Sequence, residues 1–380
     1  MLILRNNCHS QKNNGFLTIN TYQMKSTYTL FLLTFLLIAC KKEEKPTEIV
    51  NNWKDYKLSD NVKSVTEKSF ALVDGKIGEP KTENQNGYNS HLAFSNTGSL
   101  ILEKKILMNG NLLEETTFTN KDKKLLVTQY INPTSAFTTK YSWDDNGNNT
   151  IITRRNPQGE QIEKTLNTFI KNQRVEVRRF DGKDNLTDRT TYTFGKNDKV
   201  REEKAFLKEK TIQFLTDYTY DEHNNMTMEQ RLNPDYKRLY TINNKYNAQN
   251  LLIETVTLNA QDKMEYSEVK TYDAKGNLTS NRTYDGFVDG KVLEEFQYDK
   301  NNNLIQRKEI INAVVTAQLD QTYDDKNNLI TERYTGKDKA VLLDRKTAYE
   351  YDSHGNWIKK TITISGVPKF VVERKIEYFK

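Results

Sequence analysis

The feature that most constrains this chain of 380 residues is a turn motif that recurs about every 26 residues. An aromatic residue precedes a short polar turn, which leads into an aliphatic residue, as in Tyr272-Asp273-Ala274-Lys275-Gly276-Asn277-Leu278. The aromatic positions are 94, 118, 143, 169, 194, 220, 246, 272, 298, 323 and 351, with successive spacings between 24 and 28 residues. Because chance does not sustain one period through eleven registers, the chain is predicted to be a repeat protein.

A second set of turn signals lies half a period away from the first. It includes Asn109-Gly110, Asn156-Pro157, Asp181-Gly182 and Asn233-Pro234. Such dipeptides mark turns, since Gly and Asn tolerate positive φ and Pro fixes φ. Two turns in each period leave two strands of about eight or nine residues, each just under about 30 Å long. Each repeat is therefore predicted to be a β-hairpin.

The segments before the aromatic positions alternate with a period of two. Tyr218 and Tyr220 enclose Thr219, and Phe296 and Tyr298 enclose Gln297. This alternation is typical of antiparallel strands with one buried and one solvated face. We therefore predict an all-β fold in which about eleven tandem antiparallel hairpins form one extended, twisted and curling sheet. The aromatic rings of neighbouring hairpins are expected to stack in a ladder.

The turn residues have roles that follow from backbone geometry. The Asp after the aromatic residue accepts a hydrogen bond from a backbone N–H two residues later, which closes the turn. Gly276 and Gly355 tolerate the left-handed conformation that a tight turn requires. The residues assigned to these structural turns are Tyr220, Asp221, Tyr272, Asp273, Gly276, Tyr298, Asp299, Tyr323, Asp324, Tyr351, Asp352 and Gly355.

The N-terminal region reads as an export signal. Met24-Lys25 precedes an apolar run from Leu30 to Ala39, which is too short to span a bilayer but fits a signal-peptide core. Its end, Leu37-Ile38-Ala39-Cys40, resembles the lipobox of bacterial lipoproteins. That resemblance implies that Cys40 becomes the first mature residue and carries the lipid, palmitate included. The alternative is an ordinary signal peptide that ends in Cys by coincidence.

The rest of the N-terminal region divides into a doubtful extension and a tether. Residues 1–23 hold no convincing signal, and Met24 is the better start. Lys41-Lys42-Glu43-Glu44-Lys45-Pro46 is too charged to pack and resembles the signal that sends Bacteroidota lipoproteins to the outer face of the outer membrane. We predict a signal peptide at 24–39, a tether at 40–60 and a repeat domain at 61–380. Surface exposure is favoured over a periplasm-facing anchor, with a generic solvated linker as the alternative.

The turn motif resembles the YD (RHS-type) repeat of bacterial surface and toxin-delivery proteins. The resemblance covers about residues 90–380 and is strongest after residue 218. It implies hairpins laid side by side in a long curling sheet, which in some family members closes into a shell around a cargo. The chain departs from the family because Asn usually replaces the consensus Arg after the Gly. It also lacks the Asp-Pro-x-Gly motif used for self-cleavage, so delivery of a fused toxin is not expected.

Residues with recognisable chemistry are few. His91, His223 and His354 follow residue 39, and the last two occupy turn positions where other repeats carry Lys or Asn. The sequence holds no Gly-x-Ser-x-Gly and no His-Glu-x-x-His. Two Asp-x-Asn-x-Asn runs, from Asp144 and Asp299, begin like calcium loops but lack the Gly at position six and the Glu at position twelve. No catalytic residue, metal or cofactor is therefore expected.

The charge pattern bears on the partners. The net charge is +6, and Lys/Arg residues are interleaved with Asp/Glu residues, which indicates a solvated surface and no nucleic-acid partner. We predict a non-catalytic, lipid-anchored cell-envelope protein that binds or scaffolds a protein or glycan through its β-sheet face. One alternative is an immunity or encapsulating accessory protein of a secreted toxin system. Another is a cell-wall glycan-active enzyme.

Overall fold

The computed structural model describes residues 52–59, 61–83, 87–121, 124–286 and 291–380. All of them belong to one compact unit, residues 44–380. The expected signal peptide, Cys40 and most of the expected tether lie outside the described residues.

The described residues form β-strands, turns and one short 3-10 helix. The first thirteen strands are β1 (Val62–Val73), β2 (Lys76–Pro80), β3 (Asn89–Phe94), β4 (Leu100–Ile106), β5 (Leu112–Lys121), β6 (Lys124–Ile131), β7 (Ala136–Trp143), β8 (Asn149–Arg155), β9 (Gln161–Ile170), β10 (Gln173–Asp181), β11 (Leu186–Phe194), β12 (Val200–Leu207) and β13 (Thr211–Tyr220). The others are β14 (Met226–Leu232), β15 (Arg238–Tyr246), β16 (Leu252–Asn259), β17 (Met264–Tyr272), β18 (Leu278–Asp285), β19 (Lys291–Tyr298), β20 (Leu304–Ile311), β21 (Val314–Tyr323), β22 (Leu329–Thr335), η2 (Lys337–Lys339), β23 (Val341–Tyr351), β24 (Trp357–Ile364) and β25 (Val367–Tyr378).

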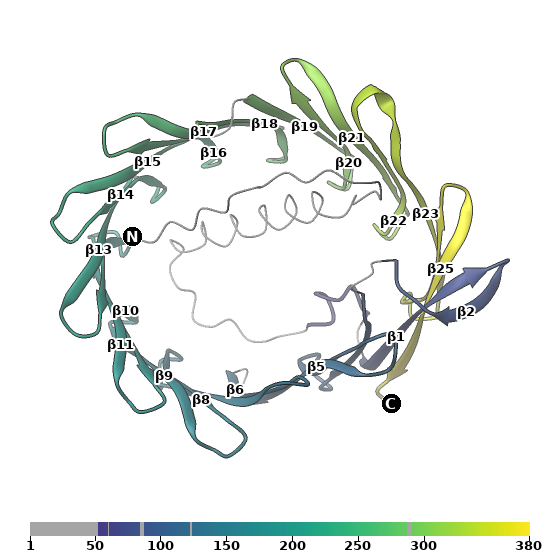
Figure 1. The fold of residues 1–380 in the computed structure, drawn as a ribbon, viewed down its shortest axis with the longest axis horizontal. Coiled ribbons are helices and arrows are strands. Elements are labelled where there is room, and N and C mark those ends of the chain that lie inside the picture. Colours follow the sequence, from purple (N-terminus) through teal and green to yellow (C-terminus); the bar gives the residue numbers. More distant parts are fainter. Residues whose placement is uncertain (1–51, 60, 84–86, 122–123, 287–290) are drawn as a thin grey trace, which may run out of the picture. The chain divides into compact units, whose positions relative to one another are not determined.

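The strands close into a barrel. From β3 to β25 each strand pairs antiparallel with the next one in the chain. The first strand, β1, pairs with β3 on one side and with β25 on the other, and β2 adds only to β1. Of the 25 strands, all except β2 therefore form a closed ring of 24 (Figure 1).

The expected extended, twisted and curling sheet of about eleven β-hairpin repeats is therefore wrong. An open sheet leaves two rows of unpaired backbone groups at its edges, whereas closure pairs both of them. Residues 62–73, which precede the first aromatic position of the repeat, supply the closing strand β1. They pair with β25 from Val62 opposite Tyr378 to Ala71 opposite Phe370. Residue alternation shows which face of a strand is buried, but it does not show whether the first and last strands meet.

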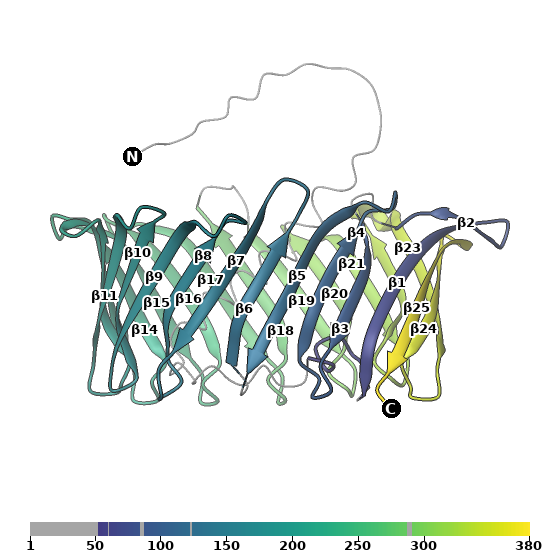
Figure 2. The same cartoon turned by 90° about the horizontal axis from the view of Figure 1, so that it is seen from below.

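The strands run obliquely between two rims, as strands of a closed barrel must (Figure 2). One rim, called the turn rim below, holds the tight turns that follow the aromatic positions. At Asp273–Asn277 the backbone N–H of Asp273 donates to the carbonyl of Asn277 at 3.0 Å, and that of Gly276 donates to the carbonyl of Asp273 at 3.0 Å. Gly276 adopts φ +85, the left-handed value that favours glycine.

The two faces of the barrel wall differ in their contacts. In Figure 1 the segment of residues 52–59 lies inside the ring. Its Trp53 and Leu58 pack in one buried cluster with Val65, Leu92 and Phe94, so these residues define the inner face. Residues that are paired across adjacent strands lie on the same face of the wall. Following these pairings around the ring places the aromatic residues of the repeat on the inner face as well.

The packed region begins before the expected boundary at residue 61. Trp53 is 5% exposed, and its Nε1 donates a hydrogen bond to the Val62 carbonyl at 2.8 Å. The side chain of Asn52 accepts a bond from the Leu100 backbone at 2.8 Å. The residues 52–59 that the sequence assigned to the tether are therefore part of the fold, because they bring their own apolar side chains to it.

Candidate binding surfaces of the barrel

The inner face carries most of the aromatic side chains of the wall. Their hydroxyl groups tie neighbouring strands together near the turn rim. Tyr220, Tyr246 and Tyr272 donate to the backbone carbonyls of Val200, Met226 and Leu252 at 2.9, 3.0 and 2.8 Å. Burial raises the pKa of Tyr272, Tyr298 and Tyr323. These rings are only half-buried, so each one both supports the wall and offers surface to the lumen.

The expected ladder of stacked rings is not what joins the repeats. Among the described aromatic contacts, rings at equivalent repeat positions do not stack on one another. Tyr220, Tyr246 and Tyr272 instead reach the backbone of the preceding strand. Hydroxyl-to-carbonyl bonds therefore take the place of ring stacking.

Arginine side chains lie against these inner rings. The Cζ of Arg231 is 3.9 Å from the centroid of the Phe214 ring, and Arg154 and Phe137 make a similar contact at 4.5 Å. A guanidinium over a ring face is held by cation–π attraction. The Nε atoms of Arg154 and Arg231 are buried without a hydrogen-bond partner. The inner face therefore places guanidinium groups directly against aromatic surface, with their Nε atoms covered.

Acidic residues share this inner surface. Burial is the main cause that raises the pKa of Glu203, while the nearby Arg231 opposes it. The Tyr218 hydroxyl donates to Glu203 at 3.5 Å, and the Tyr240 hydroxyl donates to Glu229 at 3.0 Å. The lumen wall is therefore amphipathic, with rings, guanidinium groups and carboxylates side by side.

A denser cluster lies on the inner face at the seam, the place where β25, β1 and β3 meet. Arg374 pairs with Glu67 at 2.9 Å, and its Cζ lies 3.4 Å from the centroid of Trp357. Lys360 lies over the same indole at 4.9 Å. Burial lowers the pKa of both Lys360 and Arg374. Closure of the barrel thus brings cations into a partly desolvated, aromatic environment.

The turn residues named from the sequence lie together along the turn rim. Asp273 Oδ1 accepts bonds from the backbone N–H groups of Lys275 and Asn277, both at 2.9 Å. Equivalent bonds to an Asp side chain occur at Asp144, Asp221, Asp299, Asp324 and Asp352. Adjacent turns are linked as well, since Asn277 donates to Asn302 at 3.1 Å. The hydrogen bond from the Asn277 side chain is the leading cause that lowers the pKa of Asp273.

The turn carboxylates are thus occupied by the turns themselves. Within the described ranges, no group of three or more His, Cys, Asp or Glu residues is arranged to hold a metal ion. Of the two turn histidines, His354 stacks on Tyr378 with the ring centroids 4.0 Å apart. His223 is exposed beside Glu222.

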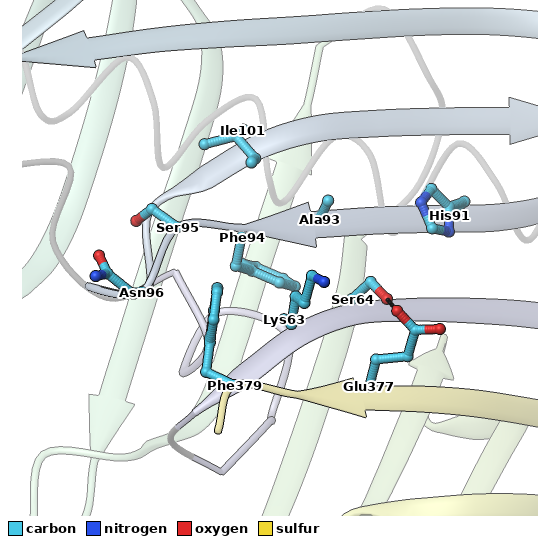
Figure 3. A pocket seen from close by; sticks show the side chains of 10 residues that line it. All are labelled: Lys63, Ser64, His91, Ala93, Phe94, Ser95, Asn96, Ile101, Glu377 and Phe379. Atoms are coloured by element: carbon cyan, nitrogen blue, oxygen red, sulfur yellow. Dashed lines mark hydrogen bonds between the residues drawn. The ribbon is translucent and has the colours of Figure 1, made fainter.

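A pocket lies at the seam, beside the turn that follows Phe94 (Figure 3). Its volume is about 640 Å³, and it is lined by Lys63, Ser64, His91, Ala93, Phe94, Ser95, Asn96, Ile101, Glu377 and Phe379. Ser64 Oγ donates to Glu377 at 3.1 Å, and His91 Nδ1 lies 2.8 Å from Thr66 Oγ1. Burial, followed by the charge of Lys104, lowers the pKa of His91. We call this site the seam pocket.

Sequence reasoning singled out His91 but assigned it no role, and it missed the other residues of the seam pocket. The pocket joins the segments around residues 63, 95 and 377, which only closure of the barrel brings together. Its Ser64 and His91 are each bonded to other partners, Glu377 and Thr66, so they do not form a nucleophile–base pair.

The outer face is polar along the middle of the strands. Ion pairs there join Lys104 to Glu115 at 2.7 Å and Arg189 to Glu176 at 2.6 Å, and nearer the turn rim Lys359 pairs with Glu350 at 2.9 Å. Several large exposed apolar side chains lie beside the turns of the rim opposite the turn rim, among them Val73, Leu207, Val314, Val341 and Val367, whereas Ile151, Ile170 and Val269 are exposed elsewhere on the outer face.

In the part of the chain that the structure describes, no helix is both long enough and apolar enough to span a lipid bilayer.

Comparisons with known proteins give no family. No family model matches the chain, and no curated protein matches it. Three solved structures align over long stretches. A porin-like protein from Bacteroides uniformis ATCC 8492 has 10% identity and a TM-score of 0.21 over 84% of this chain and 98% of that chain. A porin-like protein from Bacteroides vulgatus ATCC 8482 has 14% identity and a TM-score of 0.23 over 67% and 97%. Kluyvelomyces marxianus Hsv2 has 8% identity and a TM-score of 0.21 over 76% and 98%.

These TM-scores are too low to support an inference about fold or activity. The assignment to the YD (RHS-type) repeat family is overturned, because no family model matches and the strands form a closed barrel in place of an open repeat array. The Tyr-Asp-x-x-Gly-Asn pattern that suggested the family encodes a tight turn between antiparallel strands. That requirement belongs to the turn and is shared by unrelated proteins.

Proposed function

We propose that this protein is a non-catalytic, lipid-anchored barrel of the cell envelope that binds a protein or glycan partner through its inner face. The observation that carries the proposal is that most aromatic rings of the wall lie on that face, with arginines stacked on Phe137, Phe214 and Trp357. Aromatic and arginine side chains are the ones that contribute most to binding at protein surfaces. Arg154 and Arg231 supply such side chains beside the Phe137 and Phe214 rings.

We further propose that the barrel wall stands in water and that the lipid on Cys40 holds it at the outer membrane, with surface exposure favoured. Transmembrane barrels carry an outward apolar band about 25 Å tall. Here the middle of the outer face holds ion pairs such as Lys104 with Glu115 and Arg189 with Glu176. Charged pairs at this depth would be costly against lipid, which supports an anchor at the N-terminus in place of an embedded wall.

The binding proposal is tested by capture from intact cells with the mature chain as bait. Two variants form a matched pair. Arg231→Gln removes a guanidinium from the inner face, and Arg178→Gln removes one from the outer face. A partner that is retained by the parent and by Arg178→Gln but lost with Arg231→Gln supports the inner face as the binding surface. Equal retention by both variants contradicts it. Capture of a secreted toxin would favour the immunity or encapsulation role.

The anchor is tested separately. Cys40→Ser is expected to leave an unlipidated precursor that takes up no labelled fatty acid. Incorporation of label into that variant, or failure of the wild-type protein to partition into detergent, would overturn the lipoprotein assignment.

A further inference from the structure

The seam pocket is a second site: its Ser64, His91, Ala93 and Glu377 lie on the outer face of the wall, and Phe94 of the inner buried cluster also lines it. Its volume of about 640 Å³ falls in the range of small-molecule sites, which is roughly 300–1,000 Å³. None of the ten residues that line it belongs to the inner-face contacts of Arg154, Arg231 or Trp357. A ligand of this pocket is therefore independent of the inner-face partner.

The pocket combines polar groups of several kinds. Among the described residues, the Lys63 ammonium makes no ion pair and the Asn96 side chain makes no hydrogen bond, although both face the pocket. The Nδ1 of His91 is engaged with Thr66, which leaves Nε2 for a ligand. Glu377 contributes carboxylate oxygens, and its bond from Ser64 is the leading cause that lowers its pKa. Donors and acceptors therefore surround one opening.

The same opening has an apolar part. Phe379 and Ile101 line it, and Ile101 is 39% exposed. In Figure 3, Lys63 lies between the Phe379 ring and the pair formed by Ser64 and Glu377, so the apolar and polar parts are adjacent. An aromatic ring beside hydrogen-bonding side chains can contact the C–H face of a ligand while its neighbours bind the edge.

We infer that the seam pocket binds a neutral saccharide unit, one pyranose ring of a free sugar or of a glycan chain. A pyranose presents an apolar C–H face and a rim of hydroxyl groups, each both donor and acceptor, which suits Phe379 together with Lys63, Asn96 and Glu377. A purely apolar ligand would leave these polar groups unpaired, at a cost in binding free energy. A small ion is disfavoured because the pocket holds both Lys63 and Glu377. A cation is attracted by Glu377 and repelled by Lys63, and an anion is attracted by Lys63 and repelled by Glu377.

The test uses the chain from residue 41, which contains no cysteine and takes no lipid, and a panel of the neutral sugars glucose, galactose, mannose and N-acetylglucosamine. Ligand-observed saturation-transfer NMR is expected to detect at least one of them, with a millimolar dissociation constant. Phe379→Ala is expected to weaken that signal at least tenfold. Because Phe379 also packs against the buried cluster at the seam, Asn96→Ala, in an exposed turn, provides a second variant that does not disturb the packing.

Two controls separate this inference from the proposed function. Phe180→Ala removes an aromatic ring on the outer face of β10, away from the pocket, and is expected to leave sugar binding unchanged. Arg231→Gln, which tests the inner face, is also expected to leave it unchanged. The inference is overturned if no sugar of the panel binds, if Asn96→Ala and Phe379→Ala bind as well as the parent, or if Phe180→Ala loses binding equally.

Discussion

Glu67 and Arg374 are 307 residues apart in the chain, yet Arg374 Nε donates to Glu67 Oε2 at 2.9 Å across the pairing of β1 with β25. Arg374 is simultaneously held over the Trp357 ring. The Arg374 side chain is 15% exposed and the Glu67 side chain is 27% exposed, so the pair is largely removed from water. This contact lies on the inner face, where the two ends of the barrel wall meet.

Removing one member of this pair leaves the other one partly buried and unpaired. Arg374→Met is therefore expected to lower the free energy of unfolding by about 2–3 kcal/mol, somewhat less than the roughly 3–5 kcal/mol for a fully buried pair. Lys375→Met serves as the matched control, because Lys375 is 79% exposed and should change stability by less than about 0.5 kcal/mol. Urea denaturation followed by circular dichroism measures both. Equal, small effects would show that the seam is not stabilised by this pair.

The inner-face tyrosines are expected to matter more for stability than their outward neighbours. Tyr272→Ala and Tyr298→Ala each remove a half-buried ring, and Tyr272→Ala also removes the bond to the Leu252 carbonyl. We expect a loss of about 2–4 kcal/mol for each variant. Thr271→Ala and Gln297→Ala alter exposed side chains and should stay within about 0.5 kcal/mol.

The same four variants distinguish a supporting role of the rings from a purely ligand-binding one. If Tyr298→Ala is as stable as Gln297→Ala but loses the captured partner, the rings serve binding alone. Chemical denaturation combined with the capture assay reads both properties from the same protein samples.

The turn rim is expected to make the barrel sensitive to acid. Hydrogen bonds within the turn hold the pKa of Asp144, Asp273 and Asp299 below the ordinary value of 3.8. A carboxylate whose pKa is depressed on folding stabilises the fold above its unfolded pKa, and that contribution is lost as the pH falls through the folded pKa. The urea concentration at the unfolding midpoint is therefore expected to decrease when the pH is lowered below about 4. Asp273→Asn should show a smaller decrease than the parent between pH 5 and pH 3, and an identical decrease would contradict this assignment.

Ending the chain after Tyr351 removes β24 and β25 and leaves β1 and β23 as free edges. Unpaired edges favour association between chains, so the truncated protein is expected to form oligomers and to unfold less cooperatively. Light scattering after gel filtration, with a thermal melt, measures both properties. A monomer that melts like the full chain would indicate that the wall does not depend on closure, as in an open repeat array whose ends fray independently.

The local structure of this protein could be predicted from its sequence, because its determinants are close together in the chain. The turn from Tyr272 to Leu278 carries its own Asp, Gly and Asn, and the alternation of Tyr298 with Gln297 identifies the two faces of a strand. Closure could not be predicted in this way. It depends on pairing between β1 and β25, and no pattern in the sequence of either strand identifies the other strand as its partner.

The candidate sites also divide into residues that local sequence patterns identified and residues that only barrel closure brings together. The Asp and Tyr residues of the turns were found from the sequence because they repeat. Lys63, His91 and Glu377 do not repeat and become neighbours only through closure. The family resemblance was misleading for a related reason. The shared Tyr-Asp pattern determines the local turn and does not determine how the strands assemble into a sheet or a barrel.

Barrel closure is tested most directly by a disulfide across the seam. Lys68 and Glu373 are paired residues on β1 and β25, and Glu350 and Lys359 are an equivalent pair within the hairpin of β23 and β24. Paired positions of adjacent strands lie within reach of a disulfide, whose Cα atoms are about 4.4–6.8 Å apart. In the chain from residue 41, the closed barrel predicts that Lys68→Cys/Glu373→Cys oxidises to an intramolecular disulfide as readily as Glu350→Cys/Lys359→Cys. Oxidation of the hairpin pair alone, with the seam pair remaining reduced or linking separate chains, would contradict closure.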